Sequence, residues 1–140
     1  GDHKEQIERH ILGPLITLIN ASSIDPATVA QVRRLIHPGE TVMVILDSNH
    51  SKAHVMAELE AYHSFITPGS YIVATDGCME DFYDAPIGKP NWKQDNPAAA
   101  ARDFAASHPE FVFDNPVPQF NESKLTKTIT HWPDAWLKRI

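Results

Sequence analysis

The chain has 140 residues, of which 42% are hydrophobic and 21% charged, and its formal net charge at pH 7 is −6. These values predict one globular domain over residues 1–140 and exclude a disordered chain. The acidic balance argues against nucleic acid and anionic membranes as partners, because both are bound through basic patches.

No apolar run approaches the ~20 residues that span a bilayer, and we expect no signal peptide. Cys78 is the single cysteine, so no internal disulfide can form, which favours a reducing, cytoplasmic location.

The N-terminal part of the sequence predicts two helices around one strand. Residues 2–12 have the pattern of a short helix that a Gly-Pro pair ends. Residues 15–20 (LITLIN) are apolar and rich in β-branched side chains, which predicts a buried strand. Residues 22–36 predict a second helix, with Asp25 as its N-cap and a proline at the first helical position.

Two further strands enclose a longer helix. Residues 41–46 (TVMVIL) are apolar on both faces, which predicts a central strand of a sheet. Residues 50–66 predict a helix, and residues 71–76 (YIVATD) a third buried strand. Alternating strands and helices with short turns indicate right-handed parallel crossovers, so we predict an α/β fold with helices against the sheet.

The C-terminal part begins with a long segment that has no periodicity, residues 77–96. It is longer than an ordinary connection, which favours a lid or a binding loop. An alanine-rich helix should follow from Asn96-Pro97 to about Ser107, and residues 110–114 predict a strand. Residues 124–140 predict two strands that form an antiparallel hairpin at the edge of the sheet.

Two aspartates follow directly after predicted central strands. In open α/β sheets ligands bind at the carboxyl ends of the strands, so Asp47 and Asp76 should converge there. Paired carboxylates are hard oxygen ligands, which favour Mg²⁺ or a similar divalent cation. His50 lies one helical turn beyond Asp47 and should reach the same opening, where a neutral imidazole can accept a proton from a hydroxyl.

The same residues have alternative interpretations. An aspartate after a strand often caps the next helix, and either Asp47 or Asn49 could do so here. His50 and His54 have the i, i+4 spacing of zinc-binding helices, but no glutamate between them and no third ligand supports zinc. Nothing marks Cys78 as a nucleophile, so we expect an inert thiol.

One long segment resembles a known family. The stretch VILDSNHSKAHVMAELEAYHSFITPGSYIVATD, with SSIDP before it and HPEFVFDNPVPQFNES and THWPDAWLKR after it, is similar to the cephalosporin hydroxylase/rhamnosyl O-methyltransferase family. The resemblance implies the Rossmann-like fold of class I methyltransferases, which are enzymes that depend on S-adenosylmethionine. The chain would hold that fold in truncated form, with the first two strands and the Gly-rich loop absent. We then expect a mostly parallel sheet with the C-terminal antiparallel hairpin.

The resemblance also implies a site. Its D-x-x-H motif falls on Asp47 and His50, which would be a metal ligand and the general base. The acidic pair that ends the family's next strand falls on Thr75 and Asp76, so the aspartate matches and the threonine does not. A neutral hydroxyl removes one of three negative charges, so Mg²⁺ should bind more weakly. Acidic residues of the next loop could compensate, namely Glu80, Asp81 and Asp84.

The cofactor pocket that the resemblance implies is incomplete. The family holds S-adenosylmethionine at a Gly-rich turn and at an acidic residue after the second strand, and this sequence has neither. The loop at residues 20–25 would lie near the adenine, which makes Ser22, Ser23 and Asp25 cofactor-binding candidates. Helix capping is the alternative role, and we favour it for Asp25. We expect either a fragment of a longer enzyme or a naturally short relative.

Two functions are therefore considered. The first is a metal-dependent, S-adenosylmethionine-dependent O-methyltransferase, or the C-terminal part of one, acting on a hydroxyl of a sugar or natural product. The second is a non-catalytic α/β module for binding or assembly. An iron oxygenase is disfavoured, because it requires two histidines and a carboxylate and only Asp47 and His50 qualify.

The missing strands also bear on assembly. Without them, residues 41–46 would present an unpaired row of backbone N–H and C=O groups, which is a template for pairing. Either residues 15–20 pair with this edge or a second copy covers it, and we predict a homodimer with its interface around residues 15–46.

Overall fold

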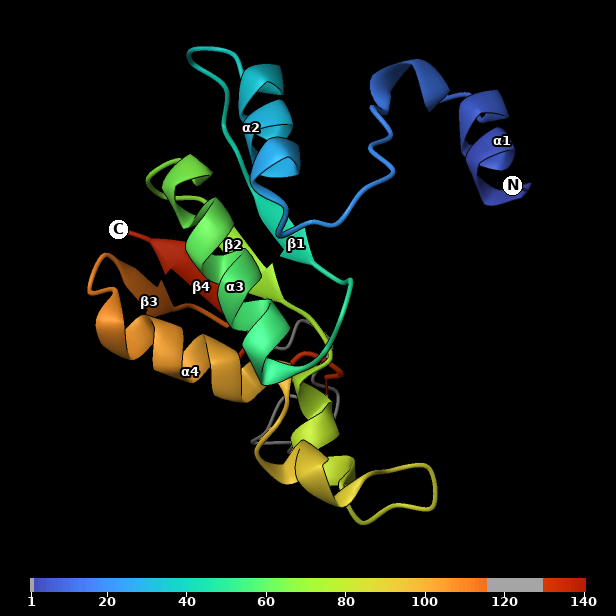
Figure 1. Ribbon diagram of the computed structural model, residues 1–140. Coiled ribbons are helices and arrows are strands. Elements are labelled where there is room, and N and C mark those ends of the chain that lie inside the picture. Colours follow the sequence, from blue (N-terminus) through green and yellow to red (C-terminus); the bar gives the residue numbers. More distant parts are fainter. Residues whose placement is uncertain (1, 116–129) are drawn as a thin grey trace, which may run out of the picture.

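The computed structural model describes residues 2–115 and 130–140 of the chain (Figure 1). Its α-helices are α1 (Asp2–Arg9), α2 (Pro26–Leu35), α3 (Lys52–Tyr62) and α4 (Pro97–Ser107). Its strands are β1 (Val44–Leu46), β2 (Tyr71–Ala74), β3 (Phe111–Phe113) and β4 (Trp136–Arg139). Short 3-10 helices occur at η1 (Gly13–Leu15), η2 (His63–Phe65), η3 (Gly77–Phe82) and η4 (Pro90–Lys93). None of the helices in these residues combines the length and the apolar character needed to cross a bilayer.

The strands form one mixed sheet in the order β1-β2-β4-β3. β1 and β2 are parallel, with Leu46 opposite Ala74, because α3 provides the long crossover that parallel neighbours need. β4 lies between β2 and β3 and is antiparallel to both. The α/β class is therefore confirmed, but the expectation of a mostly parallel sheet is wrong. The Rossmann-like architecture stays a prediction.

The predicted C-terminal hairpin is only partly visible. Its second strand is β4, which pairs with β2 and β3 rather than with a chain segment just before it. The first predicted strand of the hairpin begins at residue 124, and its part up to residue 129 lies outside the described residues, while residues 130–132 form no strand.

Two strand predictions fail at the N-terminal side of the sheet. Residues 15–20 form no strand, and Leu15 is 83% exposed. β1 begins only at Val44 and is an edge strand in the described sheet, with Ile45 55% exposed. β-branched apolar residues become buried strands only where neighbours supply hydrogen bonds and cover both faces, and here β1 has one neighbouring strand.

The helix predictions agree well with the structure. α2 begins where expected, and the Asp25 carboxylate caps it by accepting the Ala27 N–H at 2.7 Å. α4 also begins as expected, and the side-chain Oδ1 of Asn96 accepts the Ala99 N–H at 2.8 Å. Figure 1 shows α1 at a distance from the sheet, near the N-terminus.

The core lies between the sheet and the two helices α3 and α4, which pack against each other. Leu59 of α3, Phe104 of α4 and Ile72 of β2 are fully buried in it, as is Leu137 of β4. Burial of such side chains contributes about 1.5–3 kcal/mol each. The core thus holds α3 on the sheet, and the start of α3 carries the residues discussed below.

Aromatic rings join the C-terminal ends of α3 and α4. The His108 ring stacks on Phe104 with centroids 3.9 Å apart, and the His63 ring lies 4.9 Å from that of His108. Burial lowers the pKa of His63, the His108 charge lowers it further, and Glu60 and Glu110 act in the opposite direction. His63 therefore packs as a neutral ring near pH 7.

The two N-caps should differ in their contribution to stability. Asn96 is fully buried and also donates from Nδ2 to the Trp92 carbonyl at 2.8 Å, whereas Asp25 is exposed. Asn96→Ala should destabilise the chain by about 2–3 kcal/mol, since the partly buried Ala99 N–H and Trp92 C=O lose their partners. The matched variant Asp25→Ala should cost about 1 kcal/mol. Urea unfolding of both variants checks this, and equal shifts would contradict the buried cap.

The exposed edge of β1 generates a prediction about assembly. We expect a homodimer through β1, because an apolar edge strand pairs readily with a second copy. Sedimentation analysis at micromolar concentration should show a dimer for the unchanged chain. Ile45→Lys should shift it to the monomer, while Ile87→Lys, at an 84% exposed site in the 77–96 loop, should leave the dimer intact. A monomeric unchanged chain would contradict this.

Candidate functional site

The pairing of β1 with β2 places two aspartates side by side. β1 ends at Leu46 and β2 at Ala74, and the Thr75 N–H continues the ladder by donating to the Leu46 carbonyl at 3.2 Å. Asp47 and Asp76 therefore leave the sheet at the same edge. Asp76 has a φ of 58°, a left-handed conformation that aspartate adopts more readily than most residues, and it turns the chain into η3.

The carboxylate–histidine cluster, defined as Asp47, His50 and Asp76, lies at this edge. His50 Nε2 is 3.4 Å from Asp47 Oδ1 and 3.5 Å from Asp76 Oδ2. One ligand atom from each of the three residues lies within 4.8 Å of the others, which is a separation suited to one metal ion. The side chains are partly exposed, so a small molecule can reach them. The structure thus brings together the three residues that the sequence singled out, and their chemical roles stay a prediction.

Thr75 lies directly behind the cluster. Its side chain is buried, and its hydroxyl is 2.9 Å from both the Leu46 carbonyl and Asp47 Oδ1. One hydroxyl proton can be donated to one of these oxygens at a time. Thr75 therefore orients the Asp47 carboxylate. It stands at the position where the family resemblance implies an acidic residue.

The acidic residues of the next loop do not join the cluster. Both oxygens of Glu80 accept from Arg102 Nη2, at 2.8 and 2.9 Å, and Arg102 Nη1 donates to Asp134 at 3.0 Å. Burial alone would lower the pKa of Arg102, but these hydrogen bonds outweigh it and the pKa is raised. Asp81 and Asp84 are exposed and lie outside the cluster. None of the three therefore replaces the missing acid in the described structure.

The start of α3 has its own cap, which leaves Asp47 free for another role. Ser51 is the N-cap residue, and its hydroxyl accepts the His54 N–H at 3.4 Å. Asn49 Oδ1 accepts the Ser51 N–H at 2.9 Å. Neither of these contacts involves Asp47, so the capping interpretation applies to the residues after it.

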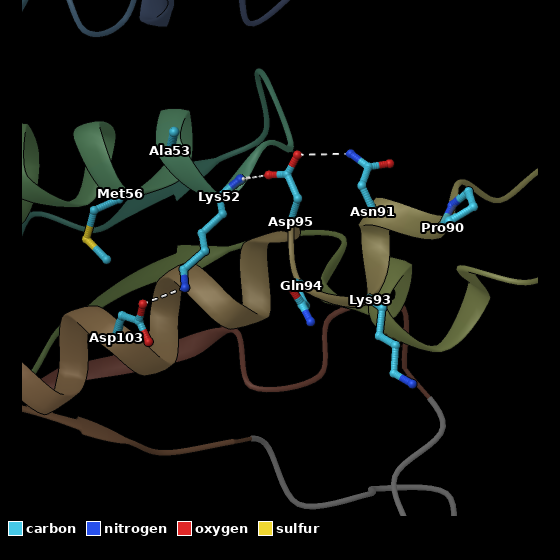
Figure 2. Close-up of a pocket in the computed structure, with 9 residues that line it drawn as sticks. All are labelled: Lys52, Ala53, Met56, Pro90, Asn91, Lys93, Gln94, Asp95 and Asp103. Carbon is cyan, nitrogen blue, oxygen red and sulfur yellow. Dashed lines mark hydrogen bonds and ion pairs between the residues drawn. The ribbon is translucent and has the colours of Figure 1, made fainter.

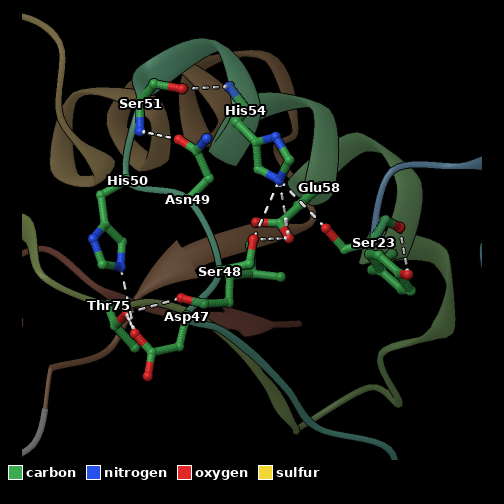
Figure 3. A network of polar contacts seen from close by, with 11 residues as sticks. Ser23, Asp47, Ser48, Asn49, His50, Ser51, His54, Glu58 and Thr75 are labelled. Carbon is green, nitrogen blue, oxygen red and sulfur yellow. Dashed lines mark hydrogen bonds and ion pairs between the residues drawn. The ribbon is translucent and has the colours of Figure 1, made fainter. Parts of the chain in front are cut away.

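His54 belongs to a separate polar network (Figure 3). Its Nε2 lies 3.2 Å from Ser48 Oγ and 3.5 Å from Glu58 Oε1, and it does not face His50. Ser48 Oγ also donates to Glu58 Oε1 at 2.7 Å. His50 and His54 therefore contact different groups rather than each other's partners.

The three cofactor-binding candidates make contacts within the protein. Ser23 Oγ is 3.3 Å from His54 Nε2, and the Ser23 carbonyl accepts the Tyr62 hydroxyl at 2.6 Å. The Ser22 carbonyl accepts the Asp25 N–H at 3.2 Å, and Asp25 caps α2. These contacts brace the loop against α2 and α3. A role of these residues in cofactor binding stays a prediction, and we assign no step of a reaction to them.

Cys78 lies close to the cluster but is not activated. Burial raises the pKa of its thiol, and the nearby charge of Asp76 raises it further. A raised pKa keeps the thiol protonated at neutral pH, and its Sγ lies 4.0 Å from His131 Nδ1, so the inert role of Cys78 stays a prediction.

A cavity of about 280 Å³ opens beside the cluster. It is lined by Asn49, His50, Ser51, Met79, Lys89, Asn91, Trp92 and Asp95. A second cavity, of about 760 Å³, lies between the start of α3, α4 and the 77–96 loop (Figure 2). Asn91 and Asp95 line both cavities.

Asp95 fixes the 77–96 loop to the start of α3. Its Oδ1 accepts the Lys52 backbone N–H at 2.7 Å, and its Oδ2 accepts from Asn91 Nδ2 at 3.1 Å (Figure 2). The sequence predicted a binding loop here but no particular residue. The sequence signal that could have located the cavity-lining residues of this loop is the cluster of Trp, Asn and Asp side chains just before α4, since such residues line ligand cavities.

The fold and the cluster define an α/β protein with acidic and imidazole groups at the carboxyl ends of neighbouring parallel strands. The model of the rhamnosyl O-methyltransferase/CmcI family matches residues 2–140, so the chain belongs to this family.

Curated relatives match part of the chain. The rhamnosyl O-methyltransferases of Mycobacterium tuberculosis and Mycobacterium bovis are 37% identical over 78 residues, which is 54% of this chain and 31% of theirs. The Mycobacterium leprae protein of the same name is 40% identical over 65 residues, or 45% of this chain and 28% of its own. The chain therefore matches about a third of the length of these relatives. No solved structure matches it significantly.

The position of Thr75 generates a prediction about cation binding. Thr75→Glu should strengthen Mg²⁺ binding, because it adds an anionic oxygen beside Asp47 and Asp76. The matched variant Thr75→Gln has the same size without the charge and should give no gain. Calorimetric titration with Mg²⁺ and Mn²⁺ measures both, and equal affinities in the two variants would rule out Thr75 as a cation-facing position.

Proposed function

We propose that this chain takes part in a metal-dependent methyl transfer from S-adenosylmethionine to a hydroxyl of a sugar or natural product. The observation that carries the proposal is the carboxylate–histidine cluster at the ends of β1 and β2, in a chain of a family named for O-methyltransferases. The mycobacterial relatives are named for transfer to rhamnosyl groups, which supports a sugar hydroxyl as acceptor.

The donor set of the cluster fits a hard divalent cation. Asp47 and Asp76 bring two carboxylates together, and among the described residues their ion pairs are with His50. Two adjacent carboxylates repel each other unless positive charge lies between them. A divalent cation bound by Asp47 and Asp76 would supply positive charge next to the acceptor oxygen and favour its deprotonation.

His50 has the geometry of a general base. Its Nε2 faces the cluster, and the same ring lines the 280 Å³ cavity. A neutral imidazole there can accept the proton of the acceptor hydroxyl as the oxygen attacks the methyl group. Asp47 and Asp76 would hold the ring and the cation in place during this step.

The cavity beside His50 suits a carbohydrate. Trp92 supplies an aromatic face, against which the C–H face of a sugar ring can pack, and Lys89, Asn91 and Asp95 supply groups for hydrogen bonds to hydroxyls. Its volume of about 280 Å³ is near the lower end for small-molecule sites. One sugar unit at this position would place a hydroxyl near His50 Nε2.

The support for S-adenosylmethionine is the family resemblance. Ser22, Ser23 and Asp25 make contacts within the protein, so the donor's binding residues are not assigned. These contacts, together with Thr75 in place of an acid, favour the second candidate function, a non-catalytic α/β module for binding or assembly.

Variants of the cluster separate the base from the metal ligands. His50→Gln should reduce methyl transfer about 10²- to 10⁴-fold, the usual contribution of a general base, while Mg²⁺ affinity changes little. Asp47→Asn should weaken Mg²⁺ binding and transfer together. Calorimetry with Mg²⁺ and transfer of a labelled methyl group to a rhamnoside measure the two effects.

The control is His37→Gln, which changes an exposed histidine away from the cluster and should leave both quantities unchanged. Calorimetry with S-adenosylmethionine, with and without Mg²⁺, tests the donor. If the chain binds neither the donor nor Mg²⁺, the non-catalytic module is the correct function.

A further inference from the structure

A second group of metal-binding side chains lies at the other end of α3. Glu60 is near the end of α3, His63 begins η2, and His108 follows α4. Glu60 is eight residues beyond Lys52, or about 12 Å along the helix axis, so this group is separate from the carboxylate–histidine cluster. One ligand atom from each of the three residues lies within 4.8 Å of the others.

One distance within the group, and one from the group to the neighbouring Glu110, are close to the distances between ligand atoms of a metal site. His108 Nε2 is 3.6 Å from Glu60 Oε2, and His63 Nδ1 is 3.9 Å from Glu110 Oε1. Ligand atoms around a tetrahedral zinc ion, each about 2.1 Å from the metal, are roughly 3.4 Å apart. Small rotations of these side chains would bring the three ligand atoms around one ion, and Glu110, beside His63, would be the fourth ligand.

The His108 ring is already oriented for this role. Its Nδ1 lies 3.1 Å from the Phe104 carbonyl, and the stack on Phe104 fixes the plane of the ring. When Nδ1–H donates to that carbonyl, Nε2 carries the lone pair and faces Glu60. Metal-binding histidines commonly donate their other ring N–H to a carbonyl in this way.

The charge around the group is suited to a cation. Among the described residues, the ion pairs of Glu60 and Glu110 are with His108 and His63. The guanidinium of Arg139, whose charge acts on His63, donates to the Ile66 carbonyl at 2.6 Å and lies 3.4 Å from that of Ser64, so its hydrogen bonds go to the backbone. The carboxylates thus have no competing lysine or arginine partner in the described structure.

We propose that Glu60, His63 and His108 form a second metal site, for zinc or a similar transition-metal ion, that joins the C-terminal ends of α3 and α4. Two imidazoles and a carboxylate prefer zinc, whereas the oxygen-rich cluster at the strand ends prefers Mg²⁺. The two sites therefore differ in metal as well as in place. An ion here connects η2 to the segment between α4 and β3 and restrains α3 at the end opposite His50.

The test is a calorimetric titration of the 140-residue chain with Zn²⁺ in saturating Mg²⁺. The unchanged chain should bind one equivalent, and His63→Gln and His108→Gln should each weaken binding at least tenfold. Asp47→Asn and the exposed-site control His37→Gln should bind zinc as the unchanged chain does. At a Zn²⁺ concentration one hundred times Kd, the folded-to-unfolded ratio of the unchanged chain should rise about a hundredfold.

A second measurement does not depend on the folding of the variants. Bound Zn²⁺ should protect His63 and His108 of the unchanged chain from modification by diethyl pyrocarbonate, while His37 stays reactive. The proposal is overturned if the unchanged chain binds zinc with a Kd above about 100 μM, which corresponds to a binding free energy weaker than about −5.5 kcal/mol. It is also overturned if both histidine variants retain full affinity, or if zinc protects neither ring.

Discussion

The parallel pairing of β1 with β2 is the interaction on which the candidate site depends. Leu46 lies opposite Ala74, and the backbone and hydroxyl of Thr75 both contact the Leu46 carbonyl. A shift of one residue in this register would turn Asp47 or Asp76 to the other face of the sheet. The convergence of the cluster is thus a property of two short strands, while the core beneath α3 and α4 holds the strands in place.

The features that the sequence predicted well depend on neighbours along the chain. The starts of α2 and α4 follow from Asp25 and Asn96 next to proline, since capping acts over three or four residues. Asp47 and Asp76 were also located by local position, because each follows a strand and His50 lies three residues beyond Asp47, but their convergence needs the pairing of β1 with β2. The separate cap of α3 by Ser51 was not foreseen, although its spacing to His54 is visible in the sequence.

The features that the sequence did not predict depend on distant partners. Residues 15–20 have strand composition, but a strand also needs a neighbour to pair with. The place of β4 between β2 and β3 depends on strand pairing between distant parts of the chain. Tyr71 and Lys138, for example, pair although they are more than sixty residues apart, and no local pattern encodes such pairs. The same holds for Asp95 with Lys52, and for His63 with His108, which topology brings together.

Asp95 has a consequence for any redesign of the two cavities. It lines both the small cavity beside His50 and the larger one between α3 and α4. A shorter residue at this position would therefore enlarge both. The same change would remove the partner of the Lys52 N–H, so α3 would fray at its first turn. Enlarging the cavities at this position therefore trades helix stability against cavity volume.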